Sequence, residues 1–251
     1  MEHILADTGL RMTYLRHSYQ LDELDQDAIL YDLSEGSIEK LTSAYLTHIN
    51  FNDFDHLVLA ADCRTNRTVG LLGMNEGSTG QEAFLELRTA FVAPSARRRR
   101  IMDRMNAHAL LRIAGSTPVP RVIFTRCSNP AWYRNLSKLA RRFTGAVVFP
   151  DHQHPAIRLE GVRLTQRLAR QVAPTLHFEI STATLRGGRI AAGLPQVWPG
   201  AHVPCKDPRL EVLFGQLLQP ADQILLTIDL RSQTEATILN DARKVYRTRA
   251  C

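Results

Sequence analysis

The feature that most constrains the fold is an alternation of β-rich runs and helical stripes in the middle of the chain. Two β-rich runs, Leu57–Ala61 and Thr68–Met74, flank the turn-prone segment Arg64–Arg67, a pattern that predicts an antiparallel hairpin. A third run covers Phe84–Val92 after a flexible, glycine-containing stretch. Strands must pair their backbone groups with neighbours, so this region predicts a sheet.

Helices and further strands follow this hairpin. Apolar residues at every fourth position of Ile101–Ile113 predict a helix with one core-facing stripe. The β-rich run Arg121–Cys127 is typical of a buried strand. Asn129 then precedes Pro130, a pair that suits the N-cap and first position of a helix. A short strand is predicted within Gly145–Pro150.

The order of these elements predicts an α/β (α+β) fold with a mixed, mostly antiparallel sheet flanked by helices. The strand-helix-strand unit from Phe84 to Phe124 predicts a parallel pair with a right-handed crossover. Another helix is predicted at Ser37–Ile49, behind Ser37 as N-cap. Past Pro150 the pattern weakens, although Gln223–Ser232 reads as a strand. We therefore predict a core at residues 1–150 and an elaborated C-terminal extension at 151–251, whose strand near 223–232 completes the sheet.

Charge and cysteine content narrow the classes of function. The formal net charge is +6 and the pI is about 9.4, which suits polyanionic partners only where the charge is clustered. Four arginines, Arg97–Arg100, form such a cluster between a predicted strand and a predicted helix. The four cysteines are widely spaced without a CxxC pair, which argues against a zinc cluster and suits free thiols in a reducing compartment. With no long apolar run and no signal-like N-terminus, we expect a cytoplasmic protein without membrane partners.

The segment around the arginines resembles the GNAT superfamily of acyl-CoA-dependent N-acyltransferases. Members commonly have a strand ending Val-x-Pro, then Arg/Gln-x-x-Gly-x-Gly/Ala, then a helix. Val92 and Pro94 match the strand end and Arg97 matches the first motif position. Asn129 and Tyr133 resemble the asparagine after the family's fifth strand and the tyrosine on the following helix. The resemblance covers roughly residues 35–150, and it implies a GNAT-like sheet and acetyl-CoA or another acyl-CoA as acyl donor.

The chain departs from the family pattern at the two small residues of the motif. Arg100 and Met102 stand there, whereas glycines would let backbone N–H groups at a helix N-terminus approach a pyrophosphate closely. Two outcomes stay open: the guanidinium groups hold the phosphates instead, or the loop binds no CoA. Bidentate arginine–phosphate contacts are strong, so the first is chemically sound.

The resemblance also implies roles for individual residues. Glu86 occupies a position where related enzymes keep a general base, and its structural alternative is a strand residue paired with Arg88 or facing solvent. Tyr133 corresponds to a general acid, or is a half-buried core residue. Asn129 is an N-cap first and a contact to the CoA arm second. The residues implied in binding the donor are Ala90, Phe91, Val92, Arg97, Arg98, Arg99, Arg100, Ile101, Met102 and Asn129.

Two classes of function follow. The first is an acyltransferase that moves an acetyl or other acyl group from acyl-CoA to a small-molecule amine in a ternary complex. The second is a non-catalytic scaffold that binds an acidic partner or nucleic acid through its basic face, although the chain lacks paired aromatics on adjacent strands and this disfavours nucleic acid. An acyl-carrier protein as donor and a homodimer are left open. We expect no metal, because His152 and His154 lie in a loop segment with no partner cluster.

Overall fold

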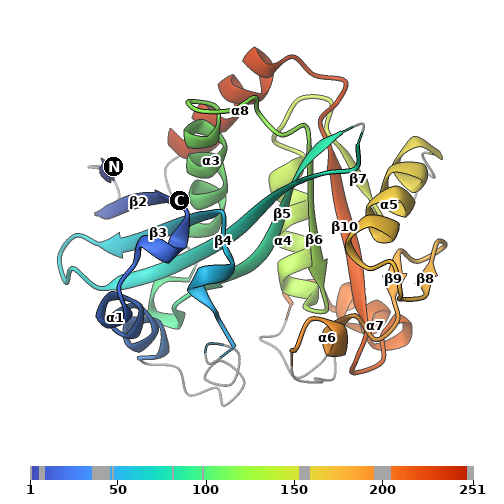
Figure 1. Ribbon diagram of the computed structural model, residues 1–251, viewed down its shortest axis with the longest axis horizontal. Helices are drawn as coiled ribbons and strands as arrows, with labels where there is room; N and C mark the ends of the chain where they lie inside the picture. Colours follow the sequence, from blue (N-terminus) through green and yellow to red (C-terminus); the bar gives the residue numbers. More distant parts are fainter. Residues whose placement is uncertain are drawn as a thin grey trace. The chain divides into compact units, whose positions relative to one another are not determined.

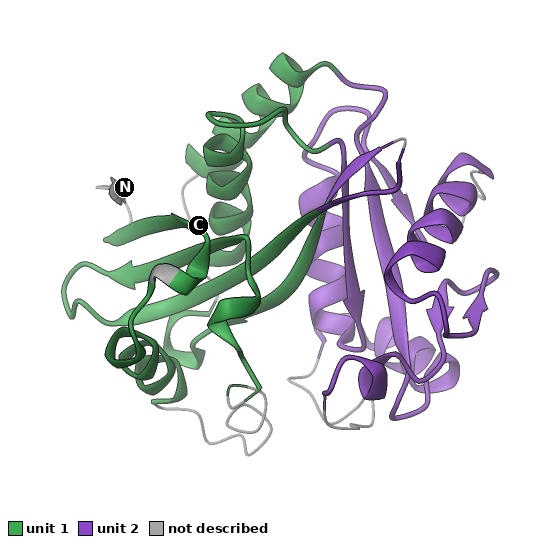
Figure 2. Ribbon diagram, viewed as in Figure 1, with its two compact units in different colours: residues 1–76, 85–120, 234–251 green, residues 77–84, 121–233 purple. Residues whose placement is uncertain are grey.

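The structure is a computed structural model (Figure 1). The residues it describes are 2–5, 9–35, 46, 48–80, 82–97, 99–152, 159–194 and 205–247. They form two compact units (Figure 2). Unit 1 comprises residues 1–76, 85–120 and 234–251, and unit 2 comprises residues 77–84 and 121–233. The predicted division at residue 150 separates a family core from an extension and stays a prediction; the compact units divide the chain elsewhere.

Unit 1 contains one antiparallel sheet with its helices. Its strands are β1 (Glu2–Leu5), β2 (Leu10–Arg16), β3 (His56–Asp62), β4 (Thr68–Ser78) and β5 (Ala83–Val92), in that spatial order, with the β4–β5 tip grouped in unit 2. Its helices are α1 (Glu23–Ser34), α3 (Ile101–Ile113) and α8 (Glu235–Arg247), with short 3₁₀ turns η2 (Ser18–Gln20), η3 (Phe51–Asp53) and η4 (Pro94–Ala96). β2 pairs with β3 and β3 with β4, all antiparallel, which confirms the predicted hairpin.

Helix α3 is the main covering layer of the unit 1 sheet. It contacts β2 and β3, and α8 packs against it. The predicted stripe is buried, since Ile101, Met105 and Ile113 are at most 2% exposed. The close approach depends on Gly70 in β4, where an added Cβ would lie 3.0 Å from Cγ2 of Ile101 and 3.1 Å from Sδ of Met105. A larger residue at Gly70 would require these two side chains of α3 to shift by a few tenths of an ångström.

Unit 2 is built around a buried central strand. Its strands are β6 (Val122–Cys127), β7 (Val147–Phe149), β8 (Phe178–Glu179), β9 (Thr184–Leu185) and β10 (Gln223–Asp229), and its helices are α4 (Pro130–Ala140), α5 (Leu159–Val172), α6 (Gly188–Ala191) and α7 (Pro208–Leu217). The spatial order is β6-β10-β9-β8, and β7 also pairs with β10. β10 is the strand predicted within 223–232, and it pairs antiparallel with β6.

The core of unit 2 lies between β6, β10 and α5. All seven residues of β10 are buried, as expected for a strand covered on both faces, and α4 and α5 both contact it. One polar contact crosses this core: the Oγ1 atoms of Thr165 in α5 and Thr227 in β10 are 2.9 Å apart. Thr165 Oγ1 also donates to the Gly161 carbonyl at 2.8 Å. The buried hydroxyls are therefore hydrogen-bonded, which avoids the cost of burying them alone.

These elements confirm the predicted mixed α/β fold with a mostly antiparallel sheet flanked by helices. The predicted helix at 37–49 lies almost entirely outside the described residues. The predicted crossover from Phe84 to Phe124 joins residues of the two units and stays a prediction. Within the part of the chain that the structure describes, no helix has both the length and the apolar character needed to cross a membrane.

Candidate active site

The β5–α3 junction of unit 1 is where the sequence places the phosphate loop. Val92 ends β5, and the next residue, Ala93, donates its N–H to the Val69 carbonyl at 2.9 Å. Pro94 then starts the 3₁₀ turn η4, whose Ala96 donates back to the Ala93 carbonyl at 2.9 Å. Ala93 and Ala96 are 2% and 1% exposed. The junction is therefore a short connection fixed by backbone bonds and small buried side chains.

Arg100 adopts the backbone conformation that glycine would favour. It is the N-cap of α3 with φ 56° and ψ 27°, in the left-handed region, and its side chain makes no capping hydrogen bond. A residue with a Cβ is disfavoured there by about 1–2 kcal/mol. Arg100 is therefore a non-glycine residue in a backbone conformation that favours glycine.

Two of the four consecutive arginines are paired with carboxylates. Arg99 Nη1 donates to Asp62 Oδ2 of β3 at 2.8 Å, and this bond, more than any other contact, lowers the pKa of Asp62. Arg100 donates to Asp103 Oδ2 from Nε at 3.1 Å and from Nη2 at 3.0 Å. Arg97 is half-buried, and Arg98 lies outside the described residues. Arg99 and Arg100 are therefore part-exposed and charge-paired within the protein.

The start of α3 combines opposing charges. Its first-turn N–H groups have no partner within the helix and bear partial positive charge. Arg104, one turn on, is 2% exposed, and its pKa is lowered by burial first and then by the charges of Arg100 and Arg99. Asp103 adds a carboxylate whose pKa is raised because burial outweighs the effect of Arg100. Ile101 is buried beneath the turn and Met102 is half-buried beside it.

Glu86 lies in the buried half of β5. It is 7% exposed, and its Oε2 is 3.8 Å from Nη1 of Arg88. That separation fits a loose ion pair and is too long for a hydrogen bond. The alternative in which Glu86 faces solvent is wrong. The alternative in which Glu86 pairs with Arg88 is present at this distance. Glu86 is therefore a carboxylate buried within β5.

The donor-arm residues Ala90, Phe91 and Val92 form the last part of β5. Phe91 is 9% exposed, and Ala90 and Val92 are half-buried. Together with Glu86 and the arginines, these candidates belong to unit 1. Asn129 and Tyr133 belong to unit 2, so the candidate residues divide between the two units.

Asn129 is an N-cap, as its sequence context predicts. Its Oδ1 accepts from the backbone N–H of Ala131 at 2.8 Å and of Trp132 at 3.2 Å. Pro130 occupies the first helical position of α4, where the missing N–H costs nothing. Both hydrogen bonds use the side-chain oxygen, so a contact from Asn129 to a CoA arm would rely on its amide N–H₂ or its main chain.

Tyr133 is fully buried, whereas the sequence suggested a half-buried core residue as the alternative to a general acid. It is 0% exposed, its Oη donates to the Pro150 carbonyl at 2.7 Å, and Oη accepts from the His152 N–H at 2.9 Å. Phe214 packs edge-on against its ring. Burial raises the pKa of Tyr133 above its ordinary value. The hydroxyl thus anchors the chain at Pro150–His152, a link that local sequence patterns do not reveal.

The remaining candidates are the two histidines considered as metal ligands, His152 and His154, and the cysteine Cys127. Burial lowers the pKa of His152, and His154 lies outside the described residues. Among the described residues, no group of three or more His, Cys, Asp and Glu side chains is placed to hold a metal ion. Cys127 is a buried free thiol, and burial raises its pKa to about 12. Such a thiol stays protonated at neutral pH, which disfavours an acyl-cysteine intermediate.

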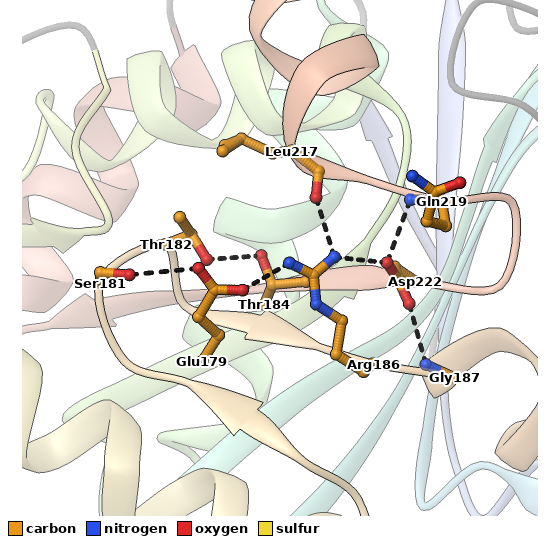
Figure 3. A network of polar contacts seen from close by, with 9 residues as sticks. All are labelled: Glu179, Ser181, Thr182, Thr184, Arg186, Gly187, Leu217, Gln219 and Asp222. Atoms are coloured by element: carbon orange, nitrogen blue, oxygen red, sulfur yellow. Dashed lines mark hydrogen bonds and ion pairs between the residues drawn. The ribbon is translucent and has the colours of Figure 1, made fainter.

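Sequence reasoning missed a polar network in unit 2 that is centred on Arg186 (Figure 3). Arg186 donates from Nη1 to Asp222 at 2.6 Å and to the Leu217 carbonyl at 3.0 Å, and from Nη2 to Glu179. Asp222 also accepts from the Gly187 N–H at 3.0 Å. The residues of the network come from β8, the segment after β9, the end of α7 and the turn just before β10, so the network ties these short elements together.

A second missed arrangement lies on the unit 1 sheet. Tyr14 Oη is 2.7 Å from Nδ1 of His56, and His56 Nε2 is 3.0 Å from Oε1 of Glu76. Nδ1 is at hydrogen-bonding distance from the tyrosine hydroxyl, whereas Nε2 makes an ion-pair contact with the carboxylate without the geometry of a hydrogen bond. His56 is 1% exposed, and burial lowers its pKa. The three residues come from adjacent strands at diagonal positions, a proximity that only strand register creates.

Comparisons with known proteins give low similarities. No family model matches the chain, and no curated protein matches it. Among solved structures, it resembles the diaminobutyrate acetyltransferase EctA from Paenibacillus lautus in complex with L-2,4-diaminobutyric acid and coenzyme A, with a TM-score of 0.38 and 22% identity over 55% of this chain and 80% of that one. It also resembles a histone acetyltransferase HPA2 and related acetyltransferase from Corynebacterium glutamicum, with a TM-score of 0.38 and 14% identity over 59% and 98% of the two chains.

A third similar structure is an acetyltransferase of the GNAT family from Bacillus anthracis, with a TM-score of 0.37 and 14% identity over 59% of this chain and 85% of that chain. All three are acetyltransferases, the class of protein that the sequence resembles. Because these TM-scores and identities are low, the chemistry proposed below rests on this chain's own residues.

Proposed function

We propose that this protein is an acyl-CoA N-acyltransferase that transfers an acetyl or other acyl group directly to a small-molecule amine. The observation that supports this most is the conformation of Arg100. Arg100 is a left-handed residue at the N-cap of α3, shortly after β5, and its side chain makes no capping hydrogen bond, a geometry that suits the binding of an anion at a helix N-terminus. The chain tolerates an unfavourable conformation at this position, as functional sites often do.

The arginines supplement this backbone site in the proposal. Arg100 lies at the helix N-terminus, and its ion pair with Asp103 is only about one-fifth exposed for each side chain. A pyrophosphate bound at the N-terminus would exchange the carboxylate for phosphate oxygens around the same guanidinium. Arg97 and Arg98 are the remaining candidates for the other phosphate of CoA. The main chain of Ala90–Val92 is the proposed contact for the pantetheine arm.

The reaction needs one base and one acid. The amine nitrogen attacks the thioester carbonyl, the carbon–sulfur bond breaks, and the amine proton passes to Glu86, which we propose as general base. Tyr133 is the proposed donor of a proton to the leaving thiolate. For that step its hydroxyl must give up the bond to the Pro150 carbonyl, which makes its role a separate question from that of Glu86.

Calorimetric titration with CoA, acetyl-CoA and 3'-dephospho-CoA tests donor binding. We expect the wild type to bind CoA, and replacement of Arg97–Arg100 by alanine to weaken binding at least tenfold, a loss of about 1.4 kcal/mol. Arg243→Ala, on the exposed face of α8, is the matched control for loss of one positive charge. If 3'-dephospho-CoA binds the wild type more weakly than CoA does, and if Arg97→Ala does not weaken that binding further, then Arg97 contacts the 3'-phosphate.

Turnover is then followed by release of free CoA with a panel of amines. Glu86→Gln should lower kcat by about 10²–10⁴-fold with little change in CoA affinity. No binding of CoA or acetyl-CoA by the folded wild type would overturn the proposal, unless an acyl-carrier protein serves as donor in the same assay. Binding without turnover across the amine panel would favour the non-catalytic scaffold instead.

A further inference from the structure

Helix α1 has two apolar faces, and among the residues that the structure describes one of them is buried and the other is exposed. Ile29 and Leu33 are buried against the unit 1 core. On the opposite side, Leu24 is 81% exposed and Tyr31 is 65% exposed. Ala28, between them, is also exposed. A helix that is apolar on both sides is normally covered on both sides, so the outer face has the character of a contact surface.

Acidic residues surround this outer face. Residues 22–35 contain six Asp and Glu and no Lys, Arg or His, in a chain whose formal net charge is +6. Asp27 lies within one helical turn of Leu24, Ala28 and Tyr31, and we call these four residues the α1 outer face. Charge of one sign around exposed apolar groups selects a partner of the opposite sign. The partner expected here is a basic helix that also offers an apolar group.

Helix α5 of the same chain has those properties. Leu159 is 67% exposed, and Arg163, Arg167 and Arg170 follow it at intervals of four, four and three residues and are all exposed. These four residues share one side of the helix, and we call them the α5 outer face. Its opposite side, with Leu164 and Leu168, is buried in the unit 2 core.

The two outer faces are complementary in chemistry. The α1 outer face joins exposed apolar groups to acidic residues, and the α5 outer face joins an exposed leucine to three exposed arginines. Arginine side chains stack favourably on aromatic rings, which suits Arg163 or Arg167 against Tyr31. We propose that two copies of this chain associate through the α1 outer face of one copy and the α5 outer face of the other.

Sedimentation velocity over a range of concentrations tests this association. A single helix–helix contact is small, so we expect a weak dimerisation that rises with concentration and falls with added salt. The α1 variant is Asp27→Lys with Glu23→Lys, at the exposed acidic residue one helical turn before Asp27. The α5 variant is Arg163→Glu with Arg167→Glu. Each variant alone should have a dimer dissociation constant that is about tenfold higher or more. The two variants mixed together should associate, because the basic α1 face of one then meets the acidic α5 face of the other.

The mixed experiment keeps the proposal falsifiable, because each variant should fail to associate with itself and should associate only with the variant of opposite charge. Val212→Asp, at a residue of α7 that is 59% exposed, is the control for a charge introduced outside the two outer faces and should leave dimerisation unchanged. A wild type that stays monomeric at the highest concentration reached would overturn the proposal. So would a dimer that both reversed variants retain, or reversed variants that fail to associate when mixed.

Discussion

Replacing Arg100 by glycine and, separately, by alanine isolates the cost of its backbone conformation. Arg100 has φ 56° and ψ 27°, a region that costs a residue with a Cβ about 1–2 kcal/mol and glycine almost nothing. Both variants lose the same 3.0 Å contact to Asp103. The difference in stability between them therefore reports the backbone and not the guanidinium.

The expected difference is small and has a definite sign. Glycine also gains about 0.4–1 kcal/mol of unfolded-chain entropy relative to alanine, which opposes its advantage. The remainder favours Arg100→Gly over Arg100→Ala by about 0.5–1 kcal/mol. For a chain of this size that corresponds to about 1–4 °C in Tm.

Thermal unfolding followed by circular dichroism measures this difference, and a second pair of variants controls for it. Arg243 is an exposed residue in the middle of α8, where glycine should be less stable than alanine by about 1 kcal/mol. The sign of the glycine–alanine difference should thus be opposite at the two positions. Equal or lower stability of Arg100→Gly would show that residue 100 is not held in the left-handed region, and the support for a backbone anion site would be lost.

Further predictions concern single buried groups. The pKa of His56 is lowered by burial, so the unfolded chain binds a proton on this side chain more readily than the folded chain does. The contribution of His56 to the free energy of unfolding should therefore be complete above about pH 6.5 and should decrease below it. His56→Gln should flatten this pH dependence in urea titrations. Tyr133→Phe leaves two buried backbone groups without partners and should cost about 1–3 kcal/mol; an additional fall in kcat per folded molecule is expected only if Tyr133 is the acid. Thr165→Val should cost about 1–3 kcal/mol by leaving Thr227 Oγ1 without its 2.9 Å partner, and an equally stable variant would refute that contribution. Cys127, whose pKa is raised to about 12, should react with a thiol reagent only on unfolding, and rapid labelling of the native protein at pH 7 would contradict its burial.

Local patterns predicted what depends on neighbours in the chain. The cap at Asn129 and the first-position Pro130 were readable because helix starts place particular residue types at fixed positions. The hairpin of β3 and β4 followed from two β-rich runs around a turn, and the face of α3 followed from its four-residue apolar period. These features are decided within a few residues, so sequence alone is sufficient for them.

Contacts between distant residues were not accessible in this way. Arg99 meets Asp62 at 37 residues' separation, and Tyr133 meets Pro150 at 17. The sequence indicated a basic loop there and a half-buried tyrosine, but the partners depend on which strands and loops the fold brings together. These partners affect phosphate binding, because a guanidinium that is bonded to a carboxylate attracts a phosphate less strongly than a guanidinium that is surrounded by water.

The sequence by itself determined that the chain forms a mixed sheet flanked by helices, with arginines at a strand-to-helix junction. Both properties are local, since periodicity and composition act over a few turns. Tertiary structure alone decided that Arg100 adopts a left-handed conformation, that Glu86 is buried, and that α1 has an exposed apolar face. Burial and backbone strain are properties of the assembled core, which forms only when distant segments exclude water together.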